Sequence, residues 1–304
     1  MSKLTHWDSR LTRLCKLKEE KTMRYEDNPK SIKFHVKKYL IANRELYKGK
    51  KVVDFPAGNG VTSRILKEIG AIPISMDLFP EYFEVDGLNC ERANIREGLP
   101  IQGKSVDALI CQEGIEHFSD QYEALKEFNR VLKNNGTLLI TTPNYSNIRA
   151  KLSYLFSESE RFNSTMPPNE LDSIWMSKQE ITNEIYFGHI FLIGIQKMRV
   201  LAKLSGFKIK KYHFTRIKPT SLILLPLFYP FIFISNWISY KKNLRKNKDY
   251  DTKTKKDVYG EIFRLAINPK VLVGGNLMLE FEKEQDFENV AQGLRSKHKE
   301  FGTT

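Results

Sequence analysis

The chain has 304 residues, of which 41% are hydrophobic, so it can form one large α/β domain with insertions or two small domains. Lysine and arginine total 49 against 36 aspartate and glutamate, and the formal net charge of +13 favours an anionic partner such as a membrane surface, a nucleic acid or a phosphorylated substrate. The three cysteines, Cys15, Cys90 and Cys111, form no C-x-x-C pair, which excludes a disulfide or zinc framework and is typical of a cytosolic protein. The first twenty residues lack an apolar run, so we expect no signal peptide.

Strand and helix patterns alternate from residue 30 onward. Residues 30–47 carry apolar residues near helical spacing and predict a leading helix, and further helices are predicted over 61–69 and 120–132. An "NNG" turn precedes the fifth strand. This alternation predicts an α/β fold with an open parallel sheet, whose ligands bind outside the carboxyl ends of the strands. The predicted strands cover residues 52–55, 71–76, 88–90, 106–111 and 137–142.

The stretch "DFPAGNG" follows the first predicted strand and opens a helix. Gly58 and Gly60 let the backbone approach a ligand closely, and the helix N-terminus favours a carboxylate or phosphate. Asp77 ends the second strand, 23 residues after Asp54, where an acid can bind both hydroxyls of a ribose. The pattern predicts an adenosine-type ligand, and both NAD and S-adenosylmethionine satisfy it. Pro56 stands where such turns usually carry their first glycine.

Four segments in unbroken order resemble the class I S-adenosylmethionine-dependent methyltransferases. "VVDFPAGNG" resembles their first motif, and "ANIREGLPI" (93–101) resembles the segment that contacts the adenine amine. "SVDALICQEGIEHF" (105–118) and "EFNRVLKNNGTLLITTPN" (127–144) resemble the fourth-strand motif and the fifth strand with its preceding helix. The resemblance implies a Rossmann-like, doubly wound sheet of seven strands in the order 3-2-1-4-5-7-6, with six strands parallel and strand 7 antiparallel. "QKMRVLAKLSGFKIKKYHF" (196–214) and "GGNLMLEFEK" (274–283) fit its last helix and strands.

The resemblance also implies a set of cofactor-binding residues for S-adenosylmethionine and its product S-adenosylhomocysteine. Asn94 stands where many members carry aspartate, and an amide can still serve there. No metal site is expected. The implied residues are Asp54, Pro56, Ala57, Gly58, Asn59, Gly60, Asp77, Leu78, Asn94, Ile95, Gln112, Glu113, Glu116 and His117.

Three alternatives remain open beside an active methyltransferase of this kind. An NAD enzyme would carry glycine three residues after Gly60, where Ser63 stands. A catalytically inactive S-adenosylmethionine-binding module is a second alternative, because of Pro56. A nucleic-acid methyltransferase is the third; "TPNY" (142–145) lacks the paired prolines of methylases that act on planar amines, while a basic run keeps this alternative open.

Two insertions extend the predicted methyltransferase domain, which spans residues 30–284. It is flanked by an N-terminal helical extension (1–29) and a polar C-terminal tail (285–304). The first insertion, a lid at 145–190, leaves from the fifth strand and can cover the ligand crevice. Its aromatic and acidic residues are candidates for shaping an acceptor pocket, with an ordered lid that makes no direct contacts as the alternative. These residues are Glu170, Asp172, Trp175 and Tyr186.

The second insertion, 215–268, combines an apolar run with a basic one. Residues 222–234 are thirteen consecutive apolar residues that include Pro226 and Pro230, and residues 241–256 hold eight basic and two acidic residues. The run is too short to span a membrane and its prolines should break a regular helix, so we expect a helix or hairpin that lies in the interface. A buried core or dimer segment is the alternative. The pattern of residues 221–256 therefore predicts that this segment binds an anionic membrane and lies beside the mouth of the active site.

A methyltransferase must place its acceptor in line with the methyl group and exclude water, and a hydroxyl acceptor also benefits from a general base. His189, at the end of the first insertion, and His117, after the fourth strand, are the candidate bases. We therefore expect O-methylation of a lipid-linked, glycan or quinone-like acceptor by a cytoplasmic protein that is peripheral at the inner face of the membrane.

Overall fold

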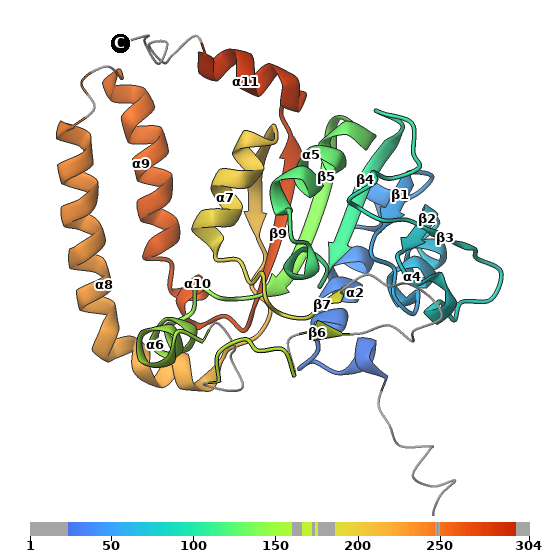
Figure 1. Ribbon diagram of the computed structural model, residues 1–304, viewed down its shortest axis with the longest axis horizontal. Helices are drawn as coiled ribbons and strands as arrows, with labels where there is room; N and C mark the ends of the chain where they lie inside the picture. Colours follow the sequence, from blue (N-terminus) through green and yellow to red (C-terminus); the bar gives the residue numbers. More distant parts are fainter. Residues whose placement is uncertain are drawn as a thin grey trace, which may run out of the picture.

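Seven strands form one mixed sheet, and helices cover both of its faces (Figure 1). Neighbouring strands follow the order β3-β2-β1-β4-β5-β9-β8. Pairing is parallel from β3 through to β5, whereas β9 pairs antiparallel with both β5 and β8. The predicted order 3-2-1-4-5-7-6, with one antiparallel strand, is therefore confirmed. The strands are β1 (Lys51–Asp54), β2 (Ile72–Asp77), β3 (Cys90–Arg92), β4 (Val106–Gln112), β5 (Leu132–Pro143), β8 (Phe207–Tyr212) and β9 (Asn276–Lys283).

The computed structural model describes residues 24–159, 166–171, 174–175, 186–246, 248 and 250–295. Most of the predicted N-terminal extension, 1–29, and Cys15 with it, lies outside these residues. The short 3-10 helix η1 (Tyr25–Asp27) is the described part of that segment.

Side chains along each strand point alternately to the two faces of the sheet, and a hydrophobic layer forms on each face. Val52 of β1 faces one layer with Leu40, and the next residue, Val53, faces the other layer with Phe128. Each layer is covered by helices whose apolar residues recur at helical spacing. The first layer is covered by α2 (Ile32–Ala42), α3 (Arg44–Tyr47) and α4 (Val61–Glu68), and the second by α5 (Gln121–Val131), α7 (Ile195–Leu204) and α11 (Phe287–Arg295).

Two local predictions differ from the structure. Residues 134–136, predicted as a turn, lie inside β5, where Asn135 adopts the left-handed conformation with φ 60°. The segment 285–304, predicted as a polar tail, contains α11, whose Val290 is buried. For α11, contacts with α5 and α7 decide the conformation of a sequence that is polar by itself.

The first insertion begins with α6 (Ile148–Ser157) at the carboxyl edge of the sheet. Asn147 caps it by accepting a hydrogen bond from the backbone N–H of Ala150 at 2.9 Å. The insertion also contains the two-residue antiparallel pair β6 (Ile174–Trp175) and β7 (Tyr186–Phe187). Figure 1 shows α6, β6 and β7 at the edge where β4 and β5 end. That the insertion covers the ligand crevice as a lid stays a prediction.

The second insertion forms the long helix α8 (Pro219–Arg245), the antiparallel helix α9 (Thr252–Ala266) and the short helix α10 (Pro269–Val273). The prediction that prolines would break α8 is wrong, because the helix runs for 27 residues through Pro226 and Pro230. It is the one helix among the described residues that is long and apolar enough to cross a membrane by length and composition, with a mean hydropathy of 1.7 and 6% of its apolar window buried.

The helix α8 starts at the carboxyl edge of the sheet and runs away from it. Ser221 ties its first turn to α6, because its hydroxyl accepts from the backbone N–H of Arg149 at 3.1 Å and donates to Asn147 Oδ1 at 3.2 Å. Figure 1 shows α8 and α9 side by side, with α7 between them and the sheet. The insertion therefore flanks the ligand edge only with the start of α8, and its basic end lies at the opposite edge.

Candidate active site

The glycine turn after β1 is shaped for a close approach to a ligand. Gly58 and Gly60 both have positive φ, 52° and 83°, and Gly60 caps α4. A Cβ at Gly60 would lie 2.6 Å from the ring of Phe83, so only glycine fits there. A Cβ at Gly58 would meet no atom within 4 Å, so it would project into the space that a ligand can occupy.

Pro56 is accommodated in this turn rather than disrupting it. Its peptide bond with Phe55 is cis, and its ring packs against Gly114, where an added Cβ would lie 2.7 Å from Pro56 Cγ. Proline lacks the N–H of the usual glycine, while the next residue, Ala57, donates its N–H to Met76 O at 2.8 Å. The turn is therefore held by Ala57 and by the neighbouring strand, and Gly58 stays open.

Asp77 holds the turn at the end of β2. Its carboxylate accepts hydrogen bonds from the backbone N–H of Gly58 at 2.7 Å and of Phe79 at 2.8 Å. The side chain is buried but lines two cavities. Of the acids at the ends of the first two strands, Asp54 and Asp77, only Asp77 thus lines the cavities.

Two cavities, of about 360 and 490 Å³, lie at the carboxyl ends of the strands and share Pro56, Asp77 and His117 as common wall. The smaller one is lined by predicted residues that follow β2 and β3, and the larger one by predicted residues of the glycine turn and the end of β4. The smaller cavity includes Leu78, Asn94 and Ile95, and the larger includes Ala57, Gly58, Asn59, Gln112 and Glu113.

Two carboxyl groups follow β4 and are withdrawn from solvent. Burial raises the pKa of Glu113 to about 7, and a hydrogen bond from Thr141 Oγ1 at 3.1 Å acts against that shift. Burial, with the neighbouring Glu113 as a second cause, raises the pKa of Glu116 well above its usual range. Within the described part of the chain, neither oxygen of Glu116 has a hydrogen-bond partner, and nor has the hydroxyl of Thr142. Two coupled, buried acids with perturbed pKa values are typical of a functional site.

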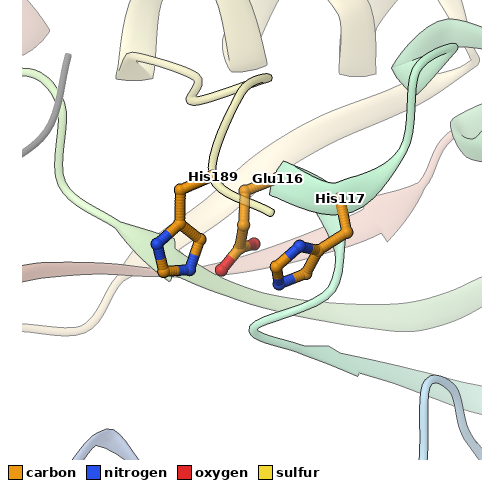
Figure 2. Close-up of side chains that lie close together, drawn as sticks. All are labelled: Glu116, His117 and His189. Atoms are coloured by element: carbon orange, nitrogen blue, oxygen red, sulfur yellow. The ribbon is translucent and has the colours of Figure 1, made fainter. Parts of the chain in front are cut away.

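Glu116, His117 and His189 converge at the wall of the larger cavity. Their ligand atoms lie within 4.8 Å of one another, and the two imidazole rings stack with centroids 5.2 Å apart. Figure 2 shows the Glu116 carboxylate between the two rings. Burial lowers the pKa of His117, so its neutral form prevails at pH 7. The sequence-predicted histidines are thus brought together, although 72 residues separate them in the chain.

Two predicted site residues, Asp54 and Gly60, support the glycine turn and line neither cavity. Asp54 is fully buried behind the turn, where it accepts a hydrogen bond from Ser63 Oγ at 2.6 Å and burial raises its pKa to about 7. Gly60 shapes the turn, and Asn144 ties the end of β5 to α10 by donating to Val271 O at 2.7 Å. These side chains position the site and do not line it.

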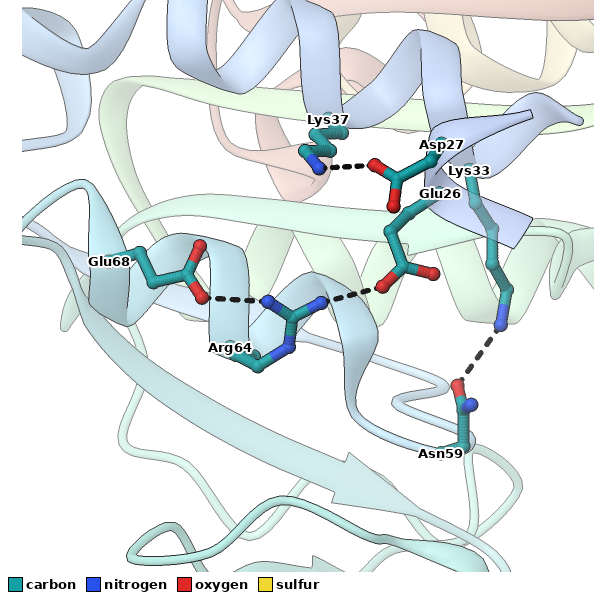
Figure 3. Close-up of polar contacts among 7 residues, drawn as sticks. All are labelled: Glu26, Asp27, Lys33, Lys37, Asn59, Arg64 and Glu68. Atoms are coloured by element: carbon teal, nitrogen blue, oxygen red, sulfur yellow. Dashed lines mark hydrogen bonds and ion pairs between the residues drawn. The ribbon is translucent and has the colours of Figure 1, made fainter. Parts of the chain in front are cut away.

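Lys33 is a site residue that the sequence did not indicate. It comes from α2, lines the larger cavity and donates to Asn59 Oδ1 at 3.0 Å. Figure 3 shows the ion pairs that join the short helix η1 to α2 and to α4. These pairs fix α2 over the glycine turn. Arg64 lies at their centre, 2.7 Å from buried Glu26 and 2.7 Å from Glu68. In the sequence, Lys33 is visible only as a lysine near the start of the predicted leading helix. No spacing rule connects such a lysine with the glycine turn.

The acceptor residues predicted in the first insertion are not brought to the cavities by the described structure. Glu170 is exposed, and it lines neither cavity. Asp172 lies outside the described residues, and so do the side chains of Trp175 and Tyr186.

The sequence model of a family described as "Methyltransferase domain" matches residues 53–140, from β1 to β5. This span contains the glycine turn, Asp77 and the Glu116–His117 pair, within a sheet of the expected strand order. Residues 53–140 therefore form a methyltransferase domain, and the strand order around it is that of the class I S-adenosylmethionine-dependent fold. The domain and the fold imply S-adenosylmethionine as the cofactor and favour it over NAD.

Named relatives of this methyltransferase include two bacterial proteins called ubiquinone biosynthesis O-methyltransferase. The one from Xanthomonas campestris pv. campestris is 24% identical over 197 residues, which cover 59% of this chain and 80% of the relative. The one from Psychrobacter arcticus is 29% identical over 120 residues, covering 36% of this chain and 45% of the relative. A solved S-adenosylmethionine-dependent methyltransferase from Archaeoglobus fulgidus covers 85% of this chain and 98% of its own, at 15% identity and a TM-score of 0.48.

The cavities fit the cofactor that the family implies. The turn leaves space at Gly58 that a methyl group would fill, and Asp77 stands where the two cavities meet. A nucleoside needs hydrogen-bonding groups in a mostly apolar cleft, and an amino-acid group needs donors for its carboxylate. The smaller cavity supplies the first through Asn94 and Ile95, and the larger supplies the second through Lys33 and the start of α4.

Proposed function

We propose that this methyltransferase methylates a hydroxyl group of a lipid-linked, glycan or quinone-like acceptor that a membrane presents to it. The observation that carries the proposal is the exposed apolar surface of α8, which starts at the carboxyl edge of the sheet and is not covered by the described residues. The enzyme would then be cytoplasmic and peripheral at the inner face of the membrane.

In this proposal each cavity holds one half of the cofactor. Asn94 and Ile95 hold the adenine, Asp77 accepts from the ribose hydroxyls, and Lys33 with the start of α4 holds the carboxylate. S-Adenosylmethionine supplies an electrophilic methyl group at this site. The remaining space of the larger cavity, lined by Gln112 and the two histidines, receives the acceptor.

The two histidines are the groups that activate the acceptor hydroxyl. His117 is fixed by hydrogen bonds of its Nδ1 with the carbonyls of Phe187 at 2.8 Å and Gly188 at 3.2 Å, so its Nε2 carries the lone pair. His189 lies against it and is exposed. Proton acceptance by a neutral imidazole at the cavity wall suits a hydroxyl acceptor, which needs a base more than an amine or a carbanion does. The name of the Xanthomonas relative, an O-methyltransferase, supports the same choice.

The apolar side chains of α8 form one exposed stripe. On a helix of 100° per residue, five of them fall within an arc of about 80°. Ile223 is 77% exposed and Phe231 is 68% exposed, which is uncommon for such side chains unless a partner covers them. The adjoining side of α8 is used internally, because Phe233 and Trp237 pack on Phe263 of α9. The stripe comprises Ile223, Leu227, Phe231, Ile234 and Ile238.

The course of α9 favours a helix that lies in the membrane surface over one that crosses it. α9 returns along α8 and is bound to α7, where Arg199 Nε lies 2.6 Å from Glu261 and Gln196 donates to Ile262 O at 2.8 Å. If α8 crossed the bilayer, Glu261 and Arg264, which flank Phe263 at the level of Trp237, would enter hydrocarbon, at about 2.5–3.5 kcal/mol for a charged residue such as arginine near its centre. An in-plane α8 avoids that cost and leaves the basic residues near anionic headgroups, at about 1 kcal/mol each.

Vesicle flotation tests the membrane part of the proposal. The full chain should float with vesicles that contain anionic lipid and much less with vesicles of neutral lipid alone. The alternative is the nucleic-acid methyltransferase that the basic run leaves open. It would be supported if as much protein floated without vesicles as with them, and if RNA retained the protein in a salt-sensitive way.

Replacing Lys33 with methionine should weaken binding of S-adenosylhomocysteine about tenfold. The substitution removes one charged hydrogen bond to the carboxylate, worth about 1.5–3 kcal/mol less the methionine's own contacts, but keeps the length of the side chain. Calorimetric titration of the purified protein measures the change.

Lys37→Met is the matched control for Lys33→Met, because Lys37 is on the same helix but pairs with Asp27 at 2.7 Å and lines neither cavity. Equal affinities for the two variants would show that Lys33 does not hold the carboxylate.

A further inference from the structure

We infer that Glu116, His117 and His189 form a binding site for one divalent transition-metal ion, which activates the acceptor hydroxyl. The inference rests on the proposed O-methylation and revises the expectation that this enzyme has no metal site. Two imidazoles and one carboxylate are a ligand set for such ions, and their three ligand atoms already lie within 4.8 Å of one another.

The geometry needs only a small closure to hold an ion. With bonds of about 2.0–2.1 Å, ligand atoms of a tetrahedral site lie on the order of 3.3 Å apart. Glu116 and His117 are fixed by the short helix η3 (Ile115–His117), and His189 lies exposed in the turn that follows β7. Figure 2 shows the carboxylate of Glu116 directed into the space between the rings.

His117 is prepared to act as a ligand through its second nitrogen. Its Nδ1 faces the carbonyl oxygens of Phe187 and Gly188, and a carbonyl can only accept, so Nδ1 carries the proton. Metal-ligating histidines commonly donate their other N–H in this way, which fixes the ring and the tautomer. The same strand and loop that supply this acceptor continue directly into His189, and Gln121 anchors them by donating to Phe191 O at 2.7 Å.

Glu116 provides an independent indication of a missing charged partner. The side chain has no exposed area, and its two oxygens find no hydrogen bond among the described residues. A buried carboxylate without a partner is costly, and a cation beside it removes that cost. Arg216, the cation that acts on neighbouring Glu113, is engaged with Asn276 Oδ1 at 3.3 Å.

The ligand set favours zinc or another imidazole-binding ion over magnesium. Imidazole suits Zn²⁺, Fe²⁺ and Ni²⁺, whereas Mg²⁺ takes oxygen ligands and keeps several waters. Three protein ligands leave at least one position open, and His117 and His189 both face the larger cavity.

An ion at this point would lower the pKa of the hydroxyl placed against it. The acceptor O–H bond then breaks and its proton passes to solvent; the oxygen forms a bond to the methyl carbon, and the electrons of the breaking carbon–sulfur bond return to sulfur, which leaves as a neutral thioether. The two histidines act as ligands in this route, not as proton acceptors.

Zinc titration of the full chain after chelator treatment tests the inference. We expect one Zn²⁺ per chain by calorimetry and metal analysis, an affinity at least about tenfold lower in Glu116→Gln and about 100-fold lower in His189→Ala, and no displacement by excess Mg²⁺. His35→Ala is the matched control, because it also removes one histidine but lies on α2 outside both cavities. Absence of zinc binding in the wild type, or equal binding by all variants, would overturn the site.

Binding of S-adenosylhomocysteine, measured on the same samples, separates this inference from the proposed function. A protein that binds S-adenosylhomocysteine but no zinc lacks the metal site and keeps the histidines as bases. A protein that binds zinc at these residues but no S-adenosylhomocysteine supports the site and contradicts the cofactor assignments.

Discussion

Replacing Asp77 with alanine should lower the affinity for S-adenosylhomocysteine by at least about 100-fold. The carboxylate stands where both cavities meet, and hydrogen bonds from two ribose hydroxyls to a charged acceptor are worth about 1.5–3 kcal/mol each. Their loss, about 3–6 kcal/mol, corresponds to roughly 10² to 10⁴ in the dissociation constant. Calorimetric titration with S-adenosylhomocysteine measures it.

Controls for this prediction must separate ligand contact from support of the turn, since Asp77 also accepts from Gly58 and Phe79. Asp77→Asn keeps one acceptor oxygen and the side-chain volume, so we expect an intermediate affinity and a melting temperature near that of the wild type. Asp86→Ala removes an exposed acid from the following loop and should change neither quantity. Unchanged affinity in Asp77→Ala would contradict the assignment of the ribose site.

Replacing Leu227, Phe231 and Ile234 with serine should abolish flotation of the protein with anionic vesicles. These side chains belong to one exposed stripe of α8, and burying each fully in an apolar phase contributes about 1.5–3 kcal/mol. Even at half of that burial, the triple variant should partition into vesicles at least about 40-fold less than the wild type. Flotation with phosphatidylethanolamine–phosphatidylglycerol vesicles, over a range of lipid concentrations, gives the partition coefficients.

The matched control for the α8 variant carries serine at Leu46 and Ile72, which are also exposed but lie on α3 and β2, on the far side of the sheet. Both proteins should bind S-adenosylhomocysteine like the wild type, because no substituted side chain lines a cavity. If the α8 variant floats as the wild type does, the membrane proposal fails while the methyltransferase fold and cofactor site stand.

Local patterns predicted an open parallel sheet, and the family resemblance added its strand order and its cofactor edge. Alternating strands and helices, together with a resemblance in unbroken order, gave the strand order with its one antiparallel strand. The predicted turn at Gly58 and the predicted acid at Asp77 form a direct hydrogen bond of 2.7 Å. These features follow from short segments whose geometry is set by glycine, by burial and by chain order.

The course of α8 could not be predicted from the same rules. Proline removes one helical hydrogen bond and is read as a break, but Pro226 and Pro230 together release only two carbonyls in a helix of 27 residues. The packing of Phe233 and Trp237 on Phe263 stabilises α8 against α9 through contacts that no local pattern shows. Tertiary contact therefore overrides the local preference.

The convergence of Glu116 with His189 was beyond sequence analysis for another reason. His189 reaches the end of β4 only because the insertion returns from α6 and is anchored to Gln121 through Phe191. Lys33 likewise reaches the glycine turn from a helix that precedes the sheet, held by Arg64 and its carboxylate partners. Both depend on contacts between segments remote in the chain, which composition and spacing do not encode.

Transfer of a labelled methyl group from S-adenosylmethionine to membranes of the cell that makes this protein tests the central claim most directly. We predict label in the organic-extractable fraction with the wild type, little with His189→Ala, and little with the α8 triple variant even though that variant still binds S-adenosylhomocysteine. Label that appears in RNA or in water-soluble material instead, or that enters the lipid fraction equally well with the α8 variant, would contradict a methyltransferase acting at the membrane surface.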